Sequence, residues 1–184
     1  MSRTISRAKS QAGFITRPWQ LAGIVLEARR TTLADYVRAV RPVVPAIMGL
    51  VASRIGPKQL KVIANFEAKL AAAVDDTEQF VATWFDAEMN AFSAVKNPAL
   101  TVAGEILQWV RVGVEPAVTA DAKSIPGVRA TNRHAQALFA KFVSAASEHN
   151  SAHATQVWAQ CLTALSPWIE ESELGRRLVL DLID

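Results

Sequence analysis

Three distant segments of this 184-residue sequence carry four side chains able to bind a metal or a ligand: Asp86 and Asn90, His134, and Cys161. Asp86 and Asn90 are four residues apart, so on a helix they share one face. Carboxylate, imidazole and thiolate groups on facing helices are what a bundle uses to build an internal metal or ligand site. The same residues also fit an ordinary interpretation. In it the three polar side chains lie at the surface, and Cys161 is a small buried hydrophobic residue.

Two further groups of residues have binding chemistry. Arg38 and Arg41 are able to hold a ligand carboxylate bidentately, although a solvated face explains them equally well. His149 and His153 are four residues apart, a spacing that can bind a metal on a helix. Because Asn150 between them is typical of a helix break, we expect both histidines to be solvent-facing turn residues.

A complete catalytic site is not recognisable. The sequence contains no Gly-x-Ser-x-Gly elbow, no phosphate-binding glycine loop and no HExxH zinc motif. A Cys161–His134 thiol pair would lack an orienting third group, so we expect the chain not to be an enzyme. The five tryptophans are typical of core or interface positions, or of the walls of an apolar ligand pocket: Trp19, Trp84, Trp109, Trp158 and Trp168.

The elements that must position these residues are predicted to be helices. Thr32 followed by Asp35 resembles a capping box that begins a helix extending to about Ile55, with Pro42 and Pro45 predicting a kink or a fresh start. Later caps and prolines divide the rest of the chain. They predict helices over about 57–74, from 77 through 92, from 98 through 110, over 128–148 and over 151–165, and a last helix from 167.

Pro116 and Pro126 predict a loop over residues 113–127. No segment alternates with period two beyond a short extended piece near residues 11–18. The predicted fold class is therefore all-α: an antiparallel bundle of six to seven helices, with a short extended stub at the N-terminus. A basic stub over residues 1–25 and a helical domain over residues 30–184 are the predicted domains.

Composition places the chain among globular proteins, since 51% of its residues are hydrophobic. Residues 1–60 carry ten Lys and Arg against two acids, a net of +8, whereas residues 61–184 carry ten against fifteen, a net of −5. The basic end suits an anionic partner such as nucleic acid, or simply a solvated arm. One cysteine, no signal peptide and no apolar run of membrane-spanning length predict a cytoplasmic protein.

Four short segments resemble motifs of a known family: residues 85–90 (FDAEMN), 96–100 (KNPAL), 132–134 (NRH) and 161–162 (CL). The family that they resemble is the effector-binding (FCD-type) domain of GntR-type transcription regulators of the FadR-like subgroup. The resemblance covers residues 30–165. In that family an Asp and three His ligate a divalent metal at the base of a small-molecule pocket. This sequence has Asn90 and Cys161 where two of the histidines are expected.

The resemblance implies a function. It implies a homodimeric sensor domain that binds a small organic acid near Arg41, Asp86, Asn90, His134 and Cys161. A divalent metal such as zinc or nickel would be held by Asp86, His134 and Cys161. The alternatives from the residues are a helical dimerisation module without a ligand and a helical metalloenzyme.

The N-terminal segment fits the same family. Residues 10–18 (SQAGFITRP) resemble the last wing strand of the winged helix-turn-helix that precedes this domain in the family. We therefore expect DNA contact only through a winged-helix unit that this chain does not contain, and no contact with a membrane.

Overall fold

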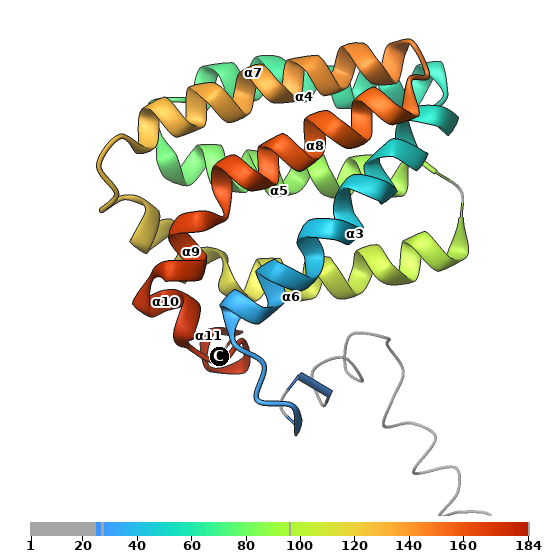
Figure 1. Ribbon diagram of the computed structural model, residues 1–184. Helices are drawn as coiled ribbons and strands as arrows, with labels where there is room; N and C mark the ends of the chain where they lie inside the picture. Colours follow the sequence, from blue (N-terminus) through green and yellow to red (C-terminus); the bar gives the residue numbers. More distant parts are fainter. Residues whose placement is uncertain (1–24, 27, 96, 184) are drawn as a thin grey trace, which may run out of the picture.

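The computed structural model describes residues 25–26, 28–95 and 97–183, and they form an all-α bundle (Figure 1). Six long helices follow one another, with three short helices at the C-terminal end. They are α3 (Leu33–Arg54), α4 (Pro57–Ala73), α5 (Thr77–Ser93), α6 (Pro98–Ala122), α7 (Val128–Ser147), α8 (Ser151–Leu165), α9 (Pro167–Glu171), α10 (Glu173–Arg176) and α11 (Leu180–Ile183). Within these residues the one β-type contact is an isolated bridge between Thr32 and Leu178. The predicted fold class is confirmed. The predicted N-terminal stub over residues 1–25 lies almost wholly outside the described residues.

Helix starts follow local capping chemistry. The backbone N–H of Asp35 donates to Thr32 Oγ1 at 3.1 Å, and the Asp35 carboxylate accepts from the Thr32 backbone N–H at 3.4 Å, which confirms the predicted capping box. Asp76 and Asn150 likewise cap α5 and α8, accepting from backbone N–H groups three residues on at 3.1 and 3.0 Å. Gly56 precedes Pro57 at the first turn of α4. These caps explain why the predicted starts of α3, α4, α5 and α8 agree with the structure.

Helix α3 continues through both of its prolines. Each proline lacks a backbone N–H and so forgoes one bond of the helical ladder. Pro45 is buried and Pro42 is exposed, and the helix is unbroken from Leu33 to Arg54. A fresh start at Pro42 is therefore not observed.

The predicted loop over residues 113–127 is wrong. Helix α6 runs through Pro116 to Ala122, and only residues 123–127 connect it to α7. Val114, Val118 and Ala122 continue a buried stripe that Val110 begins, at steps of four residues. A proline inside a helix costs about 3 kcal/mol, whereas burying one valine contributes roughly 1.5–3 kcal/mol. The stripe therefore outweighs the proline, which is exposed.

Two hydrophobic clusters fill the bundle. The first lies among α3, α4, α5, α7 and α8, and its centre is a group of rings that we call the aromatic cluster: Phe80, Trp84, Phe139, Phe142 and Trp158. The second lies where α3 and α6 meet the short C-terminal helices, and we call it the valine cluster: Leu33, Val37, Val110, Val114, Val118, Leu174 and Val179.

The C-terminal helices close the end of the bundle near the start of α3. The backbone N–H of Leu33 donates to the carbonyl of Arg177 at 2.9 Å, and that of Val179 donates to the carbonyl of Thr31 at 3.0 Å. Figure 1 shows the short helices at the end of the bundle where α3 begins, with α6 along the edge opposite α7; α10 contacts α3, and α11 contacts α6. The two ends of the described chain therefore jointly enclose the valine cluster.

In the described part of the chain, one helix is long and apolar enough to cross a membrane by length and composition alone. It is α3, with 22 residues and a mean hydropathy of 1.2. Its residues Val44, Met48 and Val51 are fully buried in the first hydrophobic cluster. The core helix of a soluble protein has the same character, so the chain is compatible with a soluble protein.

Candidate functional site

The structure separates the residues predicted to form the site. Asp86 and Asn90 are exposed on α5, where the Asn90 side-chain amide donates to the Asp86 backbone carbonyl at 2.8 Å. His134 is exposed on α7, whereas Cys161 on α8 has no exposed surface. Three of these residues thus face solvent and the fourth lies in the core.

Cys161 is part of the first hydrophobic cluster. Burial raises the pKa of its thiol to about 12, and the nearby Glu88 carboxylate adds to this increase. The side chain is therefore a neutral thiol at neutral pH, whereas a zinc ligand must be a thiolate.

Arg41 does not face a site with Asp86. Its Nη2 pairs with Glu170 Oε1 on α9, and Arg38 Nε lies 3.5 Å from the other oxygen of the same carboxylate. The two arginines therefore join α3 to α9, and their carboxylate partner already belongs to the protein.

The described residues bring together no group of three His, Cys, Asp or Glu side chains at metal-binding distance. With two exposed candidates and one buried neutral thiol, Asp86, His134 and Cys161 do not fit one metal-ligand set. The zinc or nickel ion stays a prediction from the resemblance.

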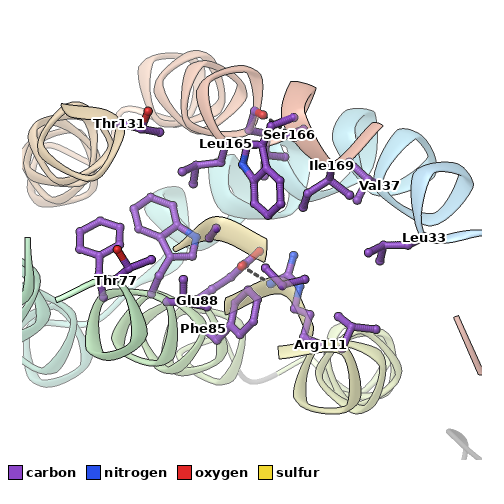
Figure 2. A pocket seen from close by; sticks show the side chains of 18 of the residues that line it. Leu33, Val37, Thr77, Phe85, Glu88, Arg111, Thr131, Leu165, Ser166 and Ile169 are labelled. Atoms are coloured by element: carbon purple, nitrogen blue, oxygen red, sulfur yellow. Dashed lines mark hydrogen bonds and ion pairs between the residues drawn. The ribbon is translucent and has the colours of Figure 1, made fainter. Parts of the chain in front are cut away.

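A cavity of about 140 Å³ lies between the two hydrophobic clusters (Figure 2). Its walls come from six helices. They include Tyr36 and Val37 of α3, Trp84, Phe85 and Glu88 of α5, Arg111, Val114 and Val118 of α6, Thr131 and Asn132 of α7, Leu162 and Leu165 of α8, and Trp168 and Ile169 of α9. A largely apolar space with a few polar groups is typical of a small-molecule site.

An ion pair between Glu88 and Arg111 lies in the wall of this cavity. The Glu88 side chain is 1% exposed and that of Arg111 is 8% exposed, with Arg111 Nη1 against Glu88 Oε2. Figure 2 shows the two side chains reaching toward each other from α5 and α6. The Arg111 guanidinium carbon also lies 5.8 Å from the centroid of the Phe85 ring, a cation–π contact.

The hydrogen bonding of this pair is incomplete. Glu88 Oε1 has no hydrogen-bond partner, whereas Arg111 contacts Glu88 Oε2 and also interacts with the Tyr36 hydroxyl. A buried polar atom without a partner costs about 1–3 kcal/mol, and more when its group is charged. The pair therefore presents an unfilled acceptor, Glu88 Oε1, in the wall of the cavity.

Burial dominates the electrostatics of these groups. It raises the pKa of the Glu88 carboxyl, and the Arg111 charge opposes that increase. Burial also raises the pKa of the Tyr36 hydroxyl, again opposed by Arg111. Among the described residues that line the cavity, the Asp, Glu, Lys, Arg or His side chains are Glu88 and Arg111, and as an ion pair they carry no net charge.

Neither residue of this pair is among the predicted site residues, yet the sequence contains a signal for both. Glu88 follows Phe80 and Trp84 at steps of four residues, and so lies on the apolar face of its helix. Arg111 follows Leu107 by four residues and precedes Val114 by three, so it lies on the apolar face of its own helix. Opposite charges on the buried faces of two successive helices predict a buried ion pair.

Comparison with known proteins gives no match: no family model matches the chain, and no curated protein or solved structure matches it. The geometry of the cavity is therefore the principal guide to function.

Proposed function

We propose that this chain is the ligand-sensing and dimerisation domain of a FadR-like transcription regulator, and that a small organic molecule binds in the cavity between the two hydrophobic clusters. The observation that carries the binding part is the ion pair of Glu88 and Arg111 beside an apolar space of about 140 Å³. The regulator part rests on the resemblance over residues 30–165 and on the basic first 60 residues.

A buried ion pair seldom adds stability compared with apolar residues of similar size, because removing two charges from water costs several kcal/mol for each ion. The pair in this cavity also leaves Glu88 Oε1 unsatisfied. A ligand that completes these hydrogen bonds gives the pair a function that folding alone does not. Arg111 thus takes the place that the sequence suggested for Arg41.

The position of the cavity suggests how binding is transmitted. Leu33 and Val37 at the start of α3 line the cavity, and so does Ile169 of α9. In the sequence the start of α3 directly follows the basic N-terminal residues, through which DNA contact would be controlled. A ligand that binds one arrangement of α3 and α9 more tightly than another shifts the population toward that arrangement, and with it the geometry of a homodimer. The cytoplasm is the compartment that this role requires.

A thermal-shift screen of small carboxylic acids, amides and alcohols tests the binding. A ligand at one hundred times its Kd stabilises the folded state by about 2.7 kcal/mol, which for a domain of this size is a rise in Tm of roughly 5–10 °C. Val118→Phe places a ring in the cavity and abolishes the rise. Val112→Phe, on the exposed face of the same helix, keeps it.

Val114→Leu is a milder filling of the cavity and serves if Val118→Phe does not fold. Failure of every compound in a broad panel to raise the Tm of the wild-type protein contradicts ligand binding. It favours instead the interaction module with an empty cavity.

A further inference from the structure

The size of the cavity suits a ligand with a single ring. A cavity of about 150 Å³ lined by apolar side chains accommodates benzene, and the space here is about 140 Å³. Trp84, Phe85, Val114 and Leu165 supply walls suited to a ring. A six-membered ring with one short substituent fills this space.

The ion pair determines what that substituent must offer. Glu88 Oε1 lacks a hydrogen-bond donor, and the guanidinium of Arg111 beside it has N–H groups able to donate. Because the two groups lie together, one substituent reaches both. It must therefore donate one hydrogen bond and accept another.

The net charge of the Glu88–Arg111 pair determines which charge the substituent can carry. Glu88 and Arg111 together carry no net charge, and no other Asp, Glu, Lys, Arg or His lines the cavity in the described residues. A ligand carboxylate would face the Glu88 carboxylate at short range and leave one negative charge uncompensated in an apolar space. A ligand ammonium would leave one positive charge beside Arg111. A neutral group adds no charge to the cavity.

We propose that the cavity binds a monocyclic ligand whose polar end is an uncharged group that both donates and accepts hydrogen bonds, a carboxamide being the simplest example. This inference rests on the proposed function, and it specifies the chemical class of the ligand. The amide N–H donates to Glu88 Oε1, and the amide oxygen accepts from Arg111. An organic acid fits the same position in its uncharged form.

Four probes of nearly equal size test the inference: benzamide, benzoate, benzylammonium and toluene. Their dissociation constants are measured by NMR titration at neutral pH with the full chain. We expect benzamide to bind at least ten times more tightly than each of the other three. Benzoate binding more tightly than benzamide, or toluene binding equally well, overturns the inference and leaves the proposed function standing.

Binding of none of these probes, together with failure of the thermal-shift screen, overturns the proposed function itself. The two failures are therefore distinguishable.

Two substitutions sharpen the test because each removes one charge of the pair and keeps a polar side chain in its place. Glu88→Gln leaves the Arg111 charge uncompensated, so we expect the preference to change from benzamide to benzoate. Arg111→Gln leaves the Glu88 charge uncompensated, so the preference changes to benzylammonium. Glu105→Gln, at an exposed position of α6, is the matched control and keeps the wild-type order.

An unchanged order in both cavity variants overturns the inference. If neither variant folds, the order of affinities in the wild-type protein decides.

Discussion

The aromatic cluster and the valine cluster use different means to fill the interior. In the aromatic cluster the ring centroids of Trp84 and Trp158 lie 5.4 Å apart, and those of Phe142 and Trp158 lie 4.9 Å apart. The valine cluster is built of smaller side chains, and the cavity with its ion pair lies between it and Phe80 and Trp84 of the aromatic cluster. The rings thus pack against one another, whereas the valine cluster borders the space that we propose as a ligand site.

The largest expected effect is at the centre of the aromatic cluster. Trp158 has no exposed surface and contacts the rings of Trp84, Phe139 and Phe142. We expect Trp158→Ala to lower the free energy of unfolding by about 3–5 kcal/mol. Val110→Ala in the valine cluster removes two carbons and costs about 2 kcal/mol. Urea unfolding of both variants measures the difference, and equal losses would contradict the contrast between the clusters.

Substitutions in the ion pair are expected to cause the next largest loss of stability. The losses of the two single variants are not expected to add in the double variant. Glu88→Leu leaves the charge of Arg111 buried without a partner and costs about 3 kcal/mol. Replacing Arg111 by Met in the same variant removes that charge. We expect the double variant to recover most of the lost stability while losing ligand binding. A double variant as unstable as the sum of the two single variants would show that the two charges are not energetically coupled, and would contradict this account.

The buried thiol predicts a dependence on alkaline pH. The pKa of Cys161 is about 12 in the folded protein, above its ordinary value of 9.0. A raised folded-state pKa means that the thiol's contribution to stability is complete below pH 9 and is lost as the pH rises toward 12. The loss is about 1.4 kcal/mol for each pH unit, or ~2.5 kcal/mol between pH 9 and 11.

Urea unfolding at several pH values, compared with that of Cys161→Ala, isolates this contribution. The variant removes the thiol, so its stability is expected to fall less steeply over the same pH interval. Parallel curves for the two proteins would show that Cys161 does not titrate as a buried group.

The smallest expected loss of stability is at the N-cap of α3, where the valine cluster begins. Thr32→Ala removes the side-chain acceptor for the backbone N–H of Asp35. We expect a loss of about 1 kcal/mol, seen as a Tm lower by roughly 2–4 °C. Ser53→Ala, whose exposed hydroxyl donates to a carbonyl within the same helix, is the control and changes the Tm less.

Local chemistry explains which parts of this structure could be predicted. Thr32, Asp76 and Asn150 form their hydrogen bonds within three residues, so the sequence alone locates the helices that they begin. Pro116 predicted a loop from the local sequence. Helix α6 instead continues through this proline, because its buried side chains pack against distant parts of the chain.

The site depends still more on distant contacts. Arg41 has the chemistry to bind an acid, but Glu170, which lies 129 residues further along the chain, neutralises it. Glu88 and Arg111 appear ordinary as single charged residues. Their importance arises because α5 and α6 turn both onto buried faces.

The most direct test of ligand sensing is whether a small molecule enters the space between the two clusters. Trp84 and Trp168 line the cavity, whereas Trp109 and Trp158 do not. Fluorine NMR of protein labelled with fluorotryptophan, assigned with Trp→Phe variants, reports on each ring during a benzamide titration. We predict that the resonances of Trp84 and Trp168 shift most and saturate together. Unchanged resonances at both rings, or a larger shift at Trp109, would contradict a ligand site in this cavity.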